Sequence, residues 1–104
     1  MSKTKDEFLK RVDLLESKNL KESQISSYLD QIVDHLSENE NETIELIEDI
    51  NENQAYWLVT TFEELAFTFQ SEEFIDAIET LGKKYPEIEA IDQYIMQAKS
   101  VMDA

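Results

Sequence analysis

The sequence contains no cysteine, one glycine and one proline among its 104 residues. The absence of cysteine excludes a disulfide framework, a thiol nucleophile and a cysteine-based zinc site. A single glycine and a single proline argue against a β-sandwich or β-barrel, which need many tight turns, and against a glycine-rich phosphate loop. What remains is a chain suited to helices joined by short connections.

Long hydrophobic runs are also missing. No apolar stretch approaches the roughly 18 residues of a membrane span, and the first residues, MSKTKDEFLKR, carry charges where a signal peptide needs an apolar run. A chain of 104 residues is long enough for one small domain with its own core. We therefore expect one soluble, cytoplasmic domain over residues 1–104 that has no membrane partner.

Basic residues are scarce and unevenly placed. The chain has 24 acidic and 9 basic residues, a formal net charge of −15. Six of the nine basic residues lie in the first 21 positions, and from Glu22 to Gly82 there are sixteen acids and no lysine or arginine. This balance disfavours direct binding to nucleic acid or to an anionic membrane. It suits a basic protein partner, or it serves only solubility.

Apolar residues recur at helical spacing along most of the chain, which predicts an all-α fold. The first helix is expected to begin at a capping box formed by Thr4 and Glu7, and the second to follow a break at residues 17–20, with Asn19 as a candidate cap. Further helices are predicted over about 42–52 and 54–69, and another after Ser71 as its cap. The expected architecture is a compact bundle of five or six short helices.

The helix boundaries in the second half rest on a few residues. Gly82 is expected to form a left-handed C-cap, and Pro86 to begin the last helix. Asn51 and Asn53 are weak stop signals, so the third and fourth helices are either separate or one kinked helix. The last three helices also fit a HEAT-type stack, although the sequence shows no repeat.

Two local patterns bear on metal binding and catalysis. Residues 37–48 have the polar spacing of a degenerate calcium loop, but Ser37 stands where the loop needs aspartate and Glu42 where it needs glycine. His35 is the only histidine, and no Glu-x-x-His pair exists, so the di-iron bundle pattern is absent. We expect no metal, no cofactor and no catalytic residue, and hence a protein that is not an enzyme.

The predicted helix over 42–52 has a clean amphipathic division. Its apolar residues occupy one half of the helical wheel, and four acids occupy the other: Glu45, Glu48, Asp49 and Glu52, here called the acidic ridge. The ridge is a solvated face, a partner for basic residues of the first helix (Lys10, Arg11, Lys18 or Lys21), or a binding surface for a cationic partner. The absence of nearby lysines favours the binding surface.

The predicted helix over 54–69 adds aromatic residues to this picture. Tyr56 and Phe67 point almost opposite to its core stripe, with Glu63 between them, and Trp57 also lies off the stripe. Either this helix is central and buried on both sides, or it exposes an aromatic patch beside acids, the residue mix of an interface hot spot. In the second case Tyr56, Glu63 and Phe67 join the acidic ridge as partner-binding residues.

The segment LVTTFEE at 58–64 is similar to a short segment of colicin-type DNase immunity proteins. Residues 62–88, FEELAFTFQSEEFIDAIETLGKKYPEI, resemble the helical immunity proteins of bacterial polymorphic-toxin systems more broadly. The tyrosine pair of the colicin family is absent, since only Tyr85 precedes Pro86, so the toxin-contact residues of that family are not carried over. The resemblance implies a stoichiometric protein inhibitor that blocks a basic toxin domain such as a nuclease.

Two other functions fit the same composition. A DNA mimic would use spaced carboxylates in place of phosphates to occupy a DNA-binding protein. A non-catalytic helical scaffold or regulatory subunit would use its charge only for solubility.

Overall fold

The computed structural model describes residues 3–17 and 20–102. Helices account for most of this part of the chain, and it contains no strand, which confirms the predicted all-α class. The helix α4, a short 3₁₀ turn and α5 follow one another without a gap, so they form one rod. The elements are α1 (Lys3–Ser17), α2 (Glu22–Leu36), α3 (Glu40–Asp49), α4 (Glu52–Leu58), η1 (Val59–Thr61), α5 (Phe62–Phe69), α6 (Glu72–Lys84) and α7 (Ile91–Ser100).

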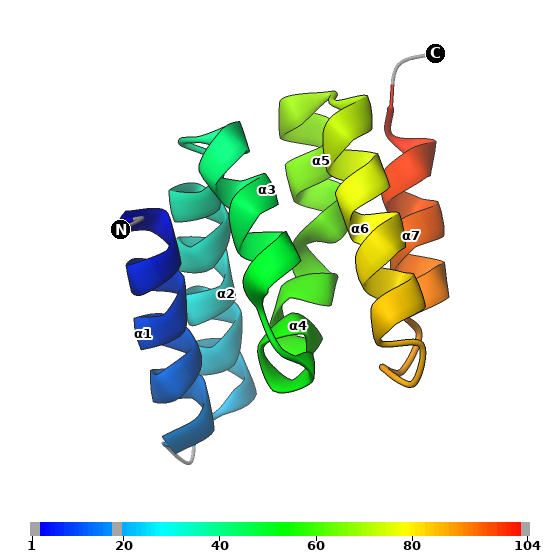
Figure 1. Ribbon diagram of the computed structural model, residues 1–104. Coiled ribbons are helices and arrows are strands. Elements are labelled where there is room, and N and C mark those ends of the chain that lie inside the picture. Colours follow the sequence, from blue (N-terminus) through cyan, green and yellow to red (C-terminus); the bar gives the residue numbers. More distant parts are fainter. Residues whose placement is uncertain (1–2, 18–19, 103–104) are drawn as a thin grey trace.

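The helices form three antiparallel hairpins that stand side by side in two layers (Figure 1). One layer holds α1, α3 and α6, and the other holds α2, the α4–α5 rod and α7. Within the layers, α3 packs against both α1 and α6, and α5 packs against both α2 and α7. This stacking is the arrangement of helical-repeat proteins, and here it extends over all three hairpins.

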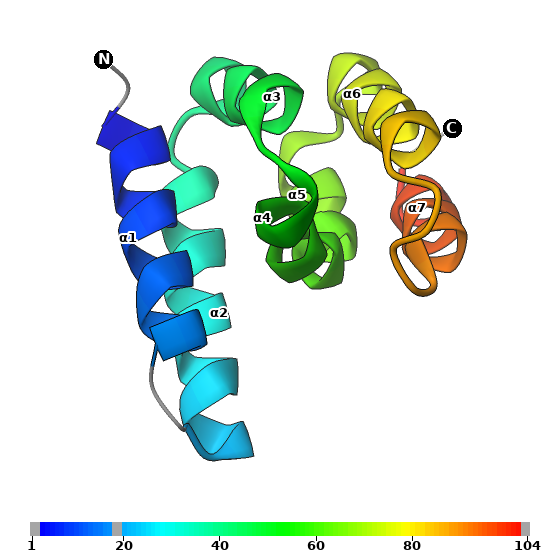
Figure 2. The ribbon, with the colours of Figure 1, turned by 60° about the horizontal axis from the view of Figure 1, so that its bottom comes forward.

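In Figure 2 the last five helices are seen closer to end-on, with α3 and α6 on one side and the α4–α5 rod and α7 on the other, while α1 and α2 are seen from the side. The radius of gyration is 12.9 Å and the principal extents are 40 × 29 × 24 Å. A compact chain of this length is expected at about 13 Å. The three hairpins therefore close on a common interior instead of forming an open array.

Every α-helix contributes to one apolar core. The largest buried side chains include Phe8 of α1, Phe62 of α5 and Phe74 of α6, each at most 1% exposed. The helix α2 contributes only Ile32 and Leu36, both in its second half, as fully buried residues. Its first half therefore has no fully buried residue.

Short polar side chains fix the helix starts. The predicted cap Ser71 is confirmed, because its hydroxyl accepts a hydrogen bond from the backbone N–H of Phe74 at 3.2 Å. Asn51 and Gln54 form a reciprocal capping box, with bonds of 2.9 and 3.0 Å. The third and fourth predicted helices are therefore separate, and the alternative of one kinked helix is wrong.

Three predicted boundaries are wrong for tertiary or local reasons. Thr4 does not cap α1 but lies inside it and is buried. Gly82 lies inside α6 and not at a left-handed C-cap. Glycine fits there because a Cβ atom would lie 2.7 Å from Ile95 Cδ1 on α7. Pro86 lies in the loop before α7, which begins only at Ile91. The candidate cap Asn19 falls outside the described residues.

Two helices also differ from their predicted extents. The predicted helix over 54–69 is interrupted at η1, where the hydroxyl of Thr61 donates to the carbonyl of Leu58 at 2.6 Å. Such a local bond competes with the regular helical ladder and tightens the turn. The helix predicted over 42–52 runs from Glu40 to Asp49 instead. Residues 40–48 are therefore helical, and the degenerate calcium loop is not formed.

Candidate binding surface

The structure divides the acidic ridge between two helices. Glu45, Glu48 and Asp49 lie on α3 and are exposed, whereas Glu52 lies in the first turn of α4, after the break at Asn51. The predicted continuous spacing of four acids on one helix is therefore wrong. The ridge is a step between two helices, and its three α3 members form the part that shares one helix face.

One member of the ridge has a partner within the chain. Lys5 of α1 donates a hydrogen bond and forms an ion pair with the carboxylate of Asp49. Both side chains remain exposed, at 34% and 62%, so the pair is of the weak, solvated kind. The alternative of pairing with the first helix therefore holds for Asp49, through Lys5, which was not among the four basic residues considered from the sequence. Of those four, Lys18 lies outside the described residues.

The α3 acids border a shallow hollow beside this pair. It has a volume of about 380 Å³ and is lined by Lys5, Leu46 and four carboxylates. Among the described residues, no ion pair is formed by Glu45 or Glu48. These two acids are thus the members of the ridge that remain available to a cationic partner on this side of the molecule.

The α4–α5 rod exposes the aromatic residues that the helical wheel placed off its core stripe. Tyr56 is 52% exposed and Phe67 is 68% exposed, and Glu63 is exposed as well. The alternative in which this rod is buried on both sides is therefore wrong. Trp57 is half-buried and packs against the core, with its ring edge-on to Tyr56 at a centroid distance of 5.4 Å.

Tyr56 lines a groove between the first half of α2 and the start of α7. The groove has a volume of about 520 Å³. One wall is formed by Ile25 and Leu29 of α2, and the floor by the α4–η1 segment. It is lined by Ile25, Leu29, Tyr56, Trp57, Val59, Thr60, Glu89, Ala90 and Tyr94, here called the aromatic groove.

The far wall of the aromatic groove is held in place by the loop before α7. Ile88 anchors this loop because it is only 7% exposed, and its carbonyl accepts a hydrogen bond from Ile91 at 3.2 Å. Ala90 takes a left-handed backbone with φ at 61°, a conformation that costs an alanine about 1–2 kcal/mol. Its carbonyl accepts the N–H of Tyr94 at 3.0 Å, which fixes the first turn of α7. The wall that carries Glu89 and Tyr94 is therefore preformed.

Phe67 lies at a different, smaller hollow. This hollow has a volume of about 260 Å³ and is lined by residues of α2, α5 and the segment after α7, including Val33, Glu63 and Val101. Tyr56 and Phe67 thus belong to two separate depressions along the same rod. Glu63 lies beside Phe67, whereas the aromatic groove takes its only carboxylate from Glu89.

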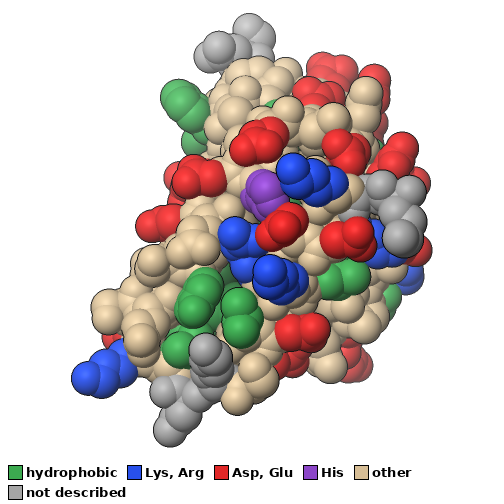
Figure 3. Space-filling view, turned by 90° about the vertical axis from the view of Figure 1, so that its left-hand side faces the viewer, with side chains coloured by type: hydrophobic (Ala, Val, Ile, Leu, Met, Phe, Trp, Pro, Cys, Tyr) green, Lys and Arg blue, Asp and Glu red, His purple; other side chains and the backbone are tan. Residues whose placement is uncertain are grey.

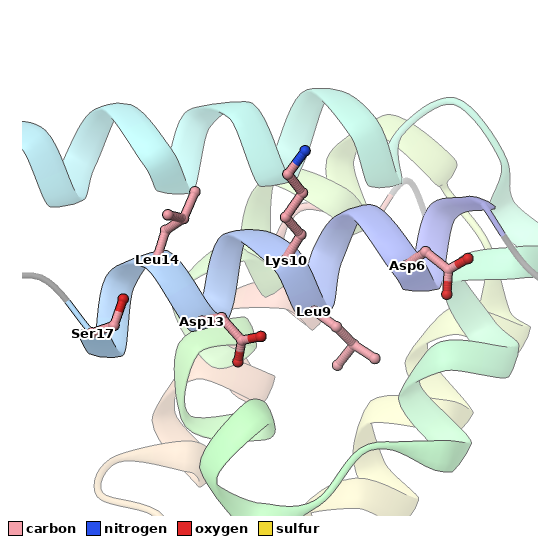
Figure 4. Close-up of a pocket in the computed structure, with 6 residues that line it drawn as sticks. All are labelled: Asp6, Leu9, Lys10, Asp13, Leu14 and Ser17. Atoms are coloured by element: carbon pink, nitrogen blue, oxygen red, sulfur yellow. The ribbon is translucent and has the colours of Figure 1, made fainter.

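A third hollow runs along α1 and has no converging polar groups. All six residues that line it come from this one helix, and they point in different directions, with Lys10 and Leu14 toward α2 and Asp6 and Asp13 away from it (Figure 4). Side chains that splay from a single helix cannot surround a ligand. This surface therefore offers no candidate site.

On the first hairpin, α1–α2, acidic side chains have basic neighbours within the chain. On the face formed by α1 and α2, basic and acidic side chains are interspersed around the single histidine (Figure 3). Arg11 donates to Glu7 at 2.6 Å, and His35 Nε2 lies 3.7 Å from the same carboxylate. The pKa of Glu7 is lowered below its ordinary value, first by the hydrogen bond from Arg11, against the opposing effect of burial. Glu7 and Arg11 thus form an ion pair within α1, and His35 of α2 lies beside it.

Residues 3–17 and 20–102 contain neither a cluster of metal-binding side chains nor a membrane-spanning helix. No group of three or more histidine, aspartate or glutamate side chains in these ranges is arranged to hold a metal ion. Within the same ranges, no helix combines the length and apolarity needed to cross a bilayer. The two depressions along the α4–α5 rod and the ridge on α3 are the surfaces that carry the exposed aromatic residues and acids predicted from the sequence.

Several residues of the aromatic groove were not predicted from the sequence to belong to a binding surface. Ile25 and Leu29 lie on the apolar stripe of α2 and were expected in the core, because a helical wheel does not show where the neighbouring helix ends. Glu89 and Tyr94 reach the groove only through the loop conformation at Ala90. The sequence held one signal of this: Tyr94 lies beside the apolar stripe of the last helix and not on it, which indicates a ring at the edge of the core.

Comparison of the sequence and structure with protein-family models, curated proteins and solved structures gave no match. The assignment of function therefore rests on the chemistry of these surfaces.

Proposed function

We propose that this chain is a non-catalytic inhibitor that binds and blocks a basic protein domain, in the manner of a bacterial immunity protein acting on its toxin. The observation that carries the proposal is the stretch from Glu22 to Gly82, which has sixteen acids and no lysine or arginine. Uniform charge of this kind raises self-repulsion in the folded state. A cationic partner would reduce that repulsion in the complex.

The two kinds of surface suggest separate contributions to binding. Exposed carboxylates such as Glu45 and Glu48 create a field that attracts a basic partner and speeds association. Exposed aromatic residues, Tyr56 and Phe67, supply the apolar contact area on which affinity depends. Glu52, the ridge member on α4, and Glu63 on α5 add exposed carboxylates on the α4–α5 rod.

DNA mimicry receives less support from the geometry. A mimic needs carboxylates at regular spacing along an extended surface, as phosphates are in DNA. Here the ridge is interrupted between Asp49 and Glu52, and Asp49 is engaged by Lys5. An inhibitor that recognises the shape and charge of one protein domain needs no such regular spacing.

The proposal is tested by capturing partners from the native host with the tagged chain and measuring association rates for the protein recovered. A ridge variant, Glu45→Lys with Glu48→Lys, should slow association roughly tenfold and reduce its salt dependence. Asp49 is left unchanged so that its pair with Lys5 survives. The matched control, Asp13→Lys with Glu16→Lys, changes the net charge equally on exposed α1 positions and should have a smaller effect.

A blocking mechanism makes a further demand on the captured protein. It should carry a basic domain, and its activity should fall linearly as the chain is added, with an end point at equal molar amounts. Capture of acidic proteins only, equal slowing by the ridge and control variants, or a fully active complex would each contradict the proposal.

A further inference from the structure

We infer that the aromatic groove binds an arginine side chain presented by the basic partner. The inference rests on the proposed function for the nature of the partner, and it names the groove as the place where the partner inserts one anchoring residue. The groove was built by tertiary contacts among α2, the α4–η1 segment and the loop before α7. It is distinct from the acidic ridge, whose α3 members line a separate hollow with Lys5.

The lining of the groove matches the chemistry of arginine. A guanidinium group is planar, stacks on aromatic rings and pairs with carboxylates. Three aromatic residues line the groove, Tyr56, Trp57 and Tyr94, together with one carboxylate, Glu89. The apolar wall of Ile25 and Leu29 offers a surface for the aliphatic stem of the same side chain.

The negative charge of the groove and of the whole chain opposes binding of a second copy of this chain. None of the described residues that line the groove is basic, so the carboxylate of Glu89 has no cationic neighbour within the lining. A second copy of this chain would bring another net charge of −15 against it, and repulsion between the two would oppose association. A cationic side chain would neutralise the carboxylate of Glu89 instead of placing more negative charge beside it.

Arginine fits the groove better than lysine does. The ammonium group of lysine is compact and strongly hydrated, so placing it among aromatic rings costs more desolvation than placing a guanidinium group there. The volume of about 520 Å³ also leaves room for the side chain together with part of the segment that carries it. The expected preference is therefore for arginine over lysine at equal charge, which charge attraction alone does not produce.

The probes for the test are a tetra-arginine and a tetra-lysine peptide, compared with the full chain at about 150 mM salt to screen long-range attraction. Calorimetry gives the dissociation constants. Trp57, the single tryptophan of the chain, lines the groove, so its fluorescence reports whether the peptide enters it. We expect tetra-arginine to bind about fivefold more tightly than tetra-lysine and to change the Trp57 emission until saturation.

Two groove variants and two matched controls locate the binding. Glu89→Gln and Tyr56→Ala should each weaken tetra-arginine binding about fivefold. Glu73→Gln removes one exposed charge and Met96→Ala removes one exposed apolar side chain elsewhere, and each should change the constant less than about twofold. Tyr56→Phe keeps the ring and should retain most of the affinity, which separates loss of stacking from loss of the hydroxyl group.

Equal affinity for the two peptides, or equal weakening by Glu89→Gln and Glu73→Gln, would overturn the inference, since either result describes attraction by net charge alone. The proposed function fails separately. If the host partner responds to the ridge variant but not to Tyr56→Ala or Glu89→Gln, the groove inference is wrong and the inhibitor proposal stands. If tetra-arginine binds in the groove but no basic protein is captured, the inhibitor proposal is wrong and the arginine site stands.

Discussion

The first hairpin, α1–α2, and the last, α6–α7, are stabilised in different ways. In the last hairpin, Phe74, Ile78 and Ala98 are fully buried, and Gly82 lets α6 approach Ile95 of α7 closely. In the first hairpin, a partly buried trio of Glu7, Arg11 and His35 lies between the helices, and the first half of α2 has no fully buried residue.

The difference has a consequence for function. In the last hairpin, a hollow of about 530 Å³ is lined by residues that include Ile75 and Asp76 of α6 and Lys99 of α7. In the first hairpin, the half-buried Ile25 and Leu29 of α2 form one wall of the aromatic groove. A helix that gives up part of its buried area loses stability in proportion to that area. The first half of α2 therefore contributes less to the core than α6 does, and it supplies an accessible apolar wall.

The largest expected effect is on the free energy of unfolding when matched truncations are made in the two hairpins. Phe74 is fully buried and packs edge-on against Phe62 and Phe69, at centroid distances of 6.5 and 5.5 Å. Phe74→Ala should cost about 3–5 kcal/mol. Ile25→Ala on half-buried α2 should cost less than about 1 kcal/mol. Urea denaturation measures both, and comparable losses would show that the first half of α2 is as well packed as α6.

The trio in the first hairpin predicts a dependence of stability on pH. Because the folded pKa of Glu7 lies below its unfolded value, the charged carboxylate stabilises the fold above the unfolded pKa, and this contribution is lost as the pH falls through the folded pKa. Glu7→Gln should therefore melt at a lower temperature than the parent at neutral pH, and the gap should narrow in acid.

Thermal melts of Glu7→Gln and the parent between about pH 7 and pH 3 measure this difference in melting temperature. Glu16→Gln, an exposed change on the same helix, serves as the control and should show little gap at any pH. A gap between Glu7→Gln and the parent that stays constant over the whole range would mean that the contribution of Glu7 does not depend on its charge.

The two hairpins also differ in how well their sequences predict them. Strong apolar periodicity correctly predicted the helices and their shared core, because burial of one face dominates helix placement. Gly82 and Pro86 were assigned from local rules for caps, but the position of Gly82 is set by Ile95 on another helix. Contacts between helices of that kind are not encoded in local spacing.

The candidate site was predicted in part for the same reason. The wheel placed Tyr56 and Phe67 off the core stripe, and both are exposed. It also placed Glu52 on the ridge, because the capping role of Asn51 was not recognised. The groove joins residues more than sixty positions apart, such as Ile25 and Glu89, and no periodicity within one helix relates them.

The smallest expected effect concerns the ion pair by which Lys5 of the first hairpin contacts Asp49 of the acidic ridge. Asp49→Asn and Glu48→Gln each remove one negative charge from adjacent exposed positions of α3, so they relieve the net charge of −15 equally. Only Asp49→Asn also removes the partner of Lys5. Glu48→Gln should leave the melting temperature unchanged or slightly higher, and Asp49→Asn should lower it relative to Glu48→Gln. A double-mutant cycle with Lys5→Ala should give a coupling of about 0.2–1 kcal/mol that shrinks with added salt, as expected for a pair this exposed. A coupling of zero would return Asp49 to the set of acids available to a partner, and the whole α3 part of the ridge would then act as one binding surface.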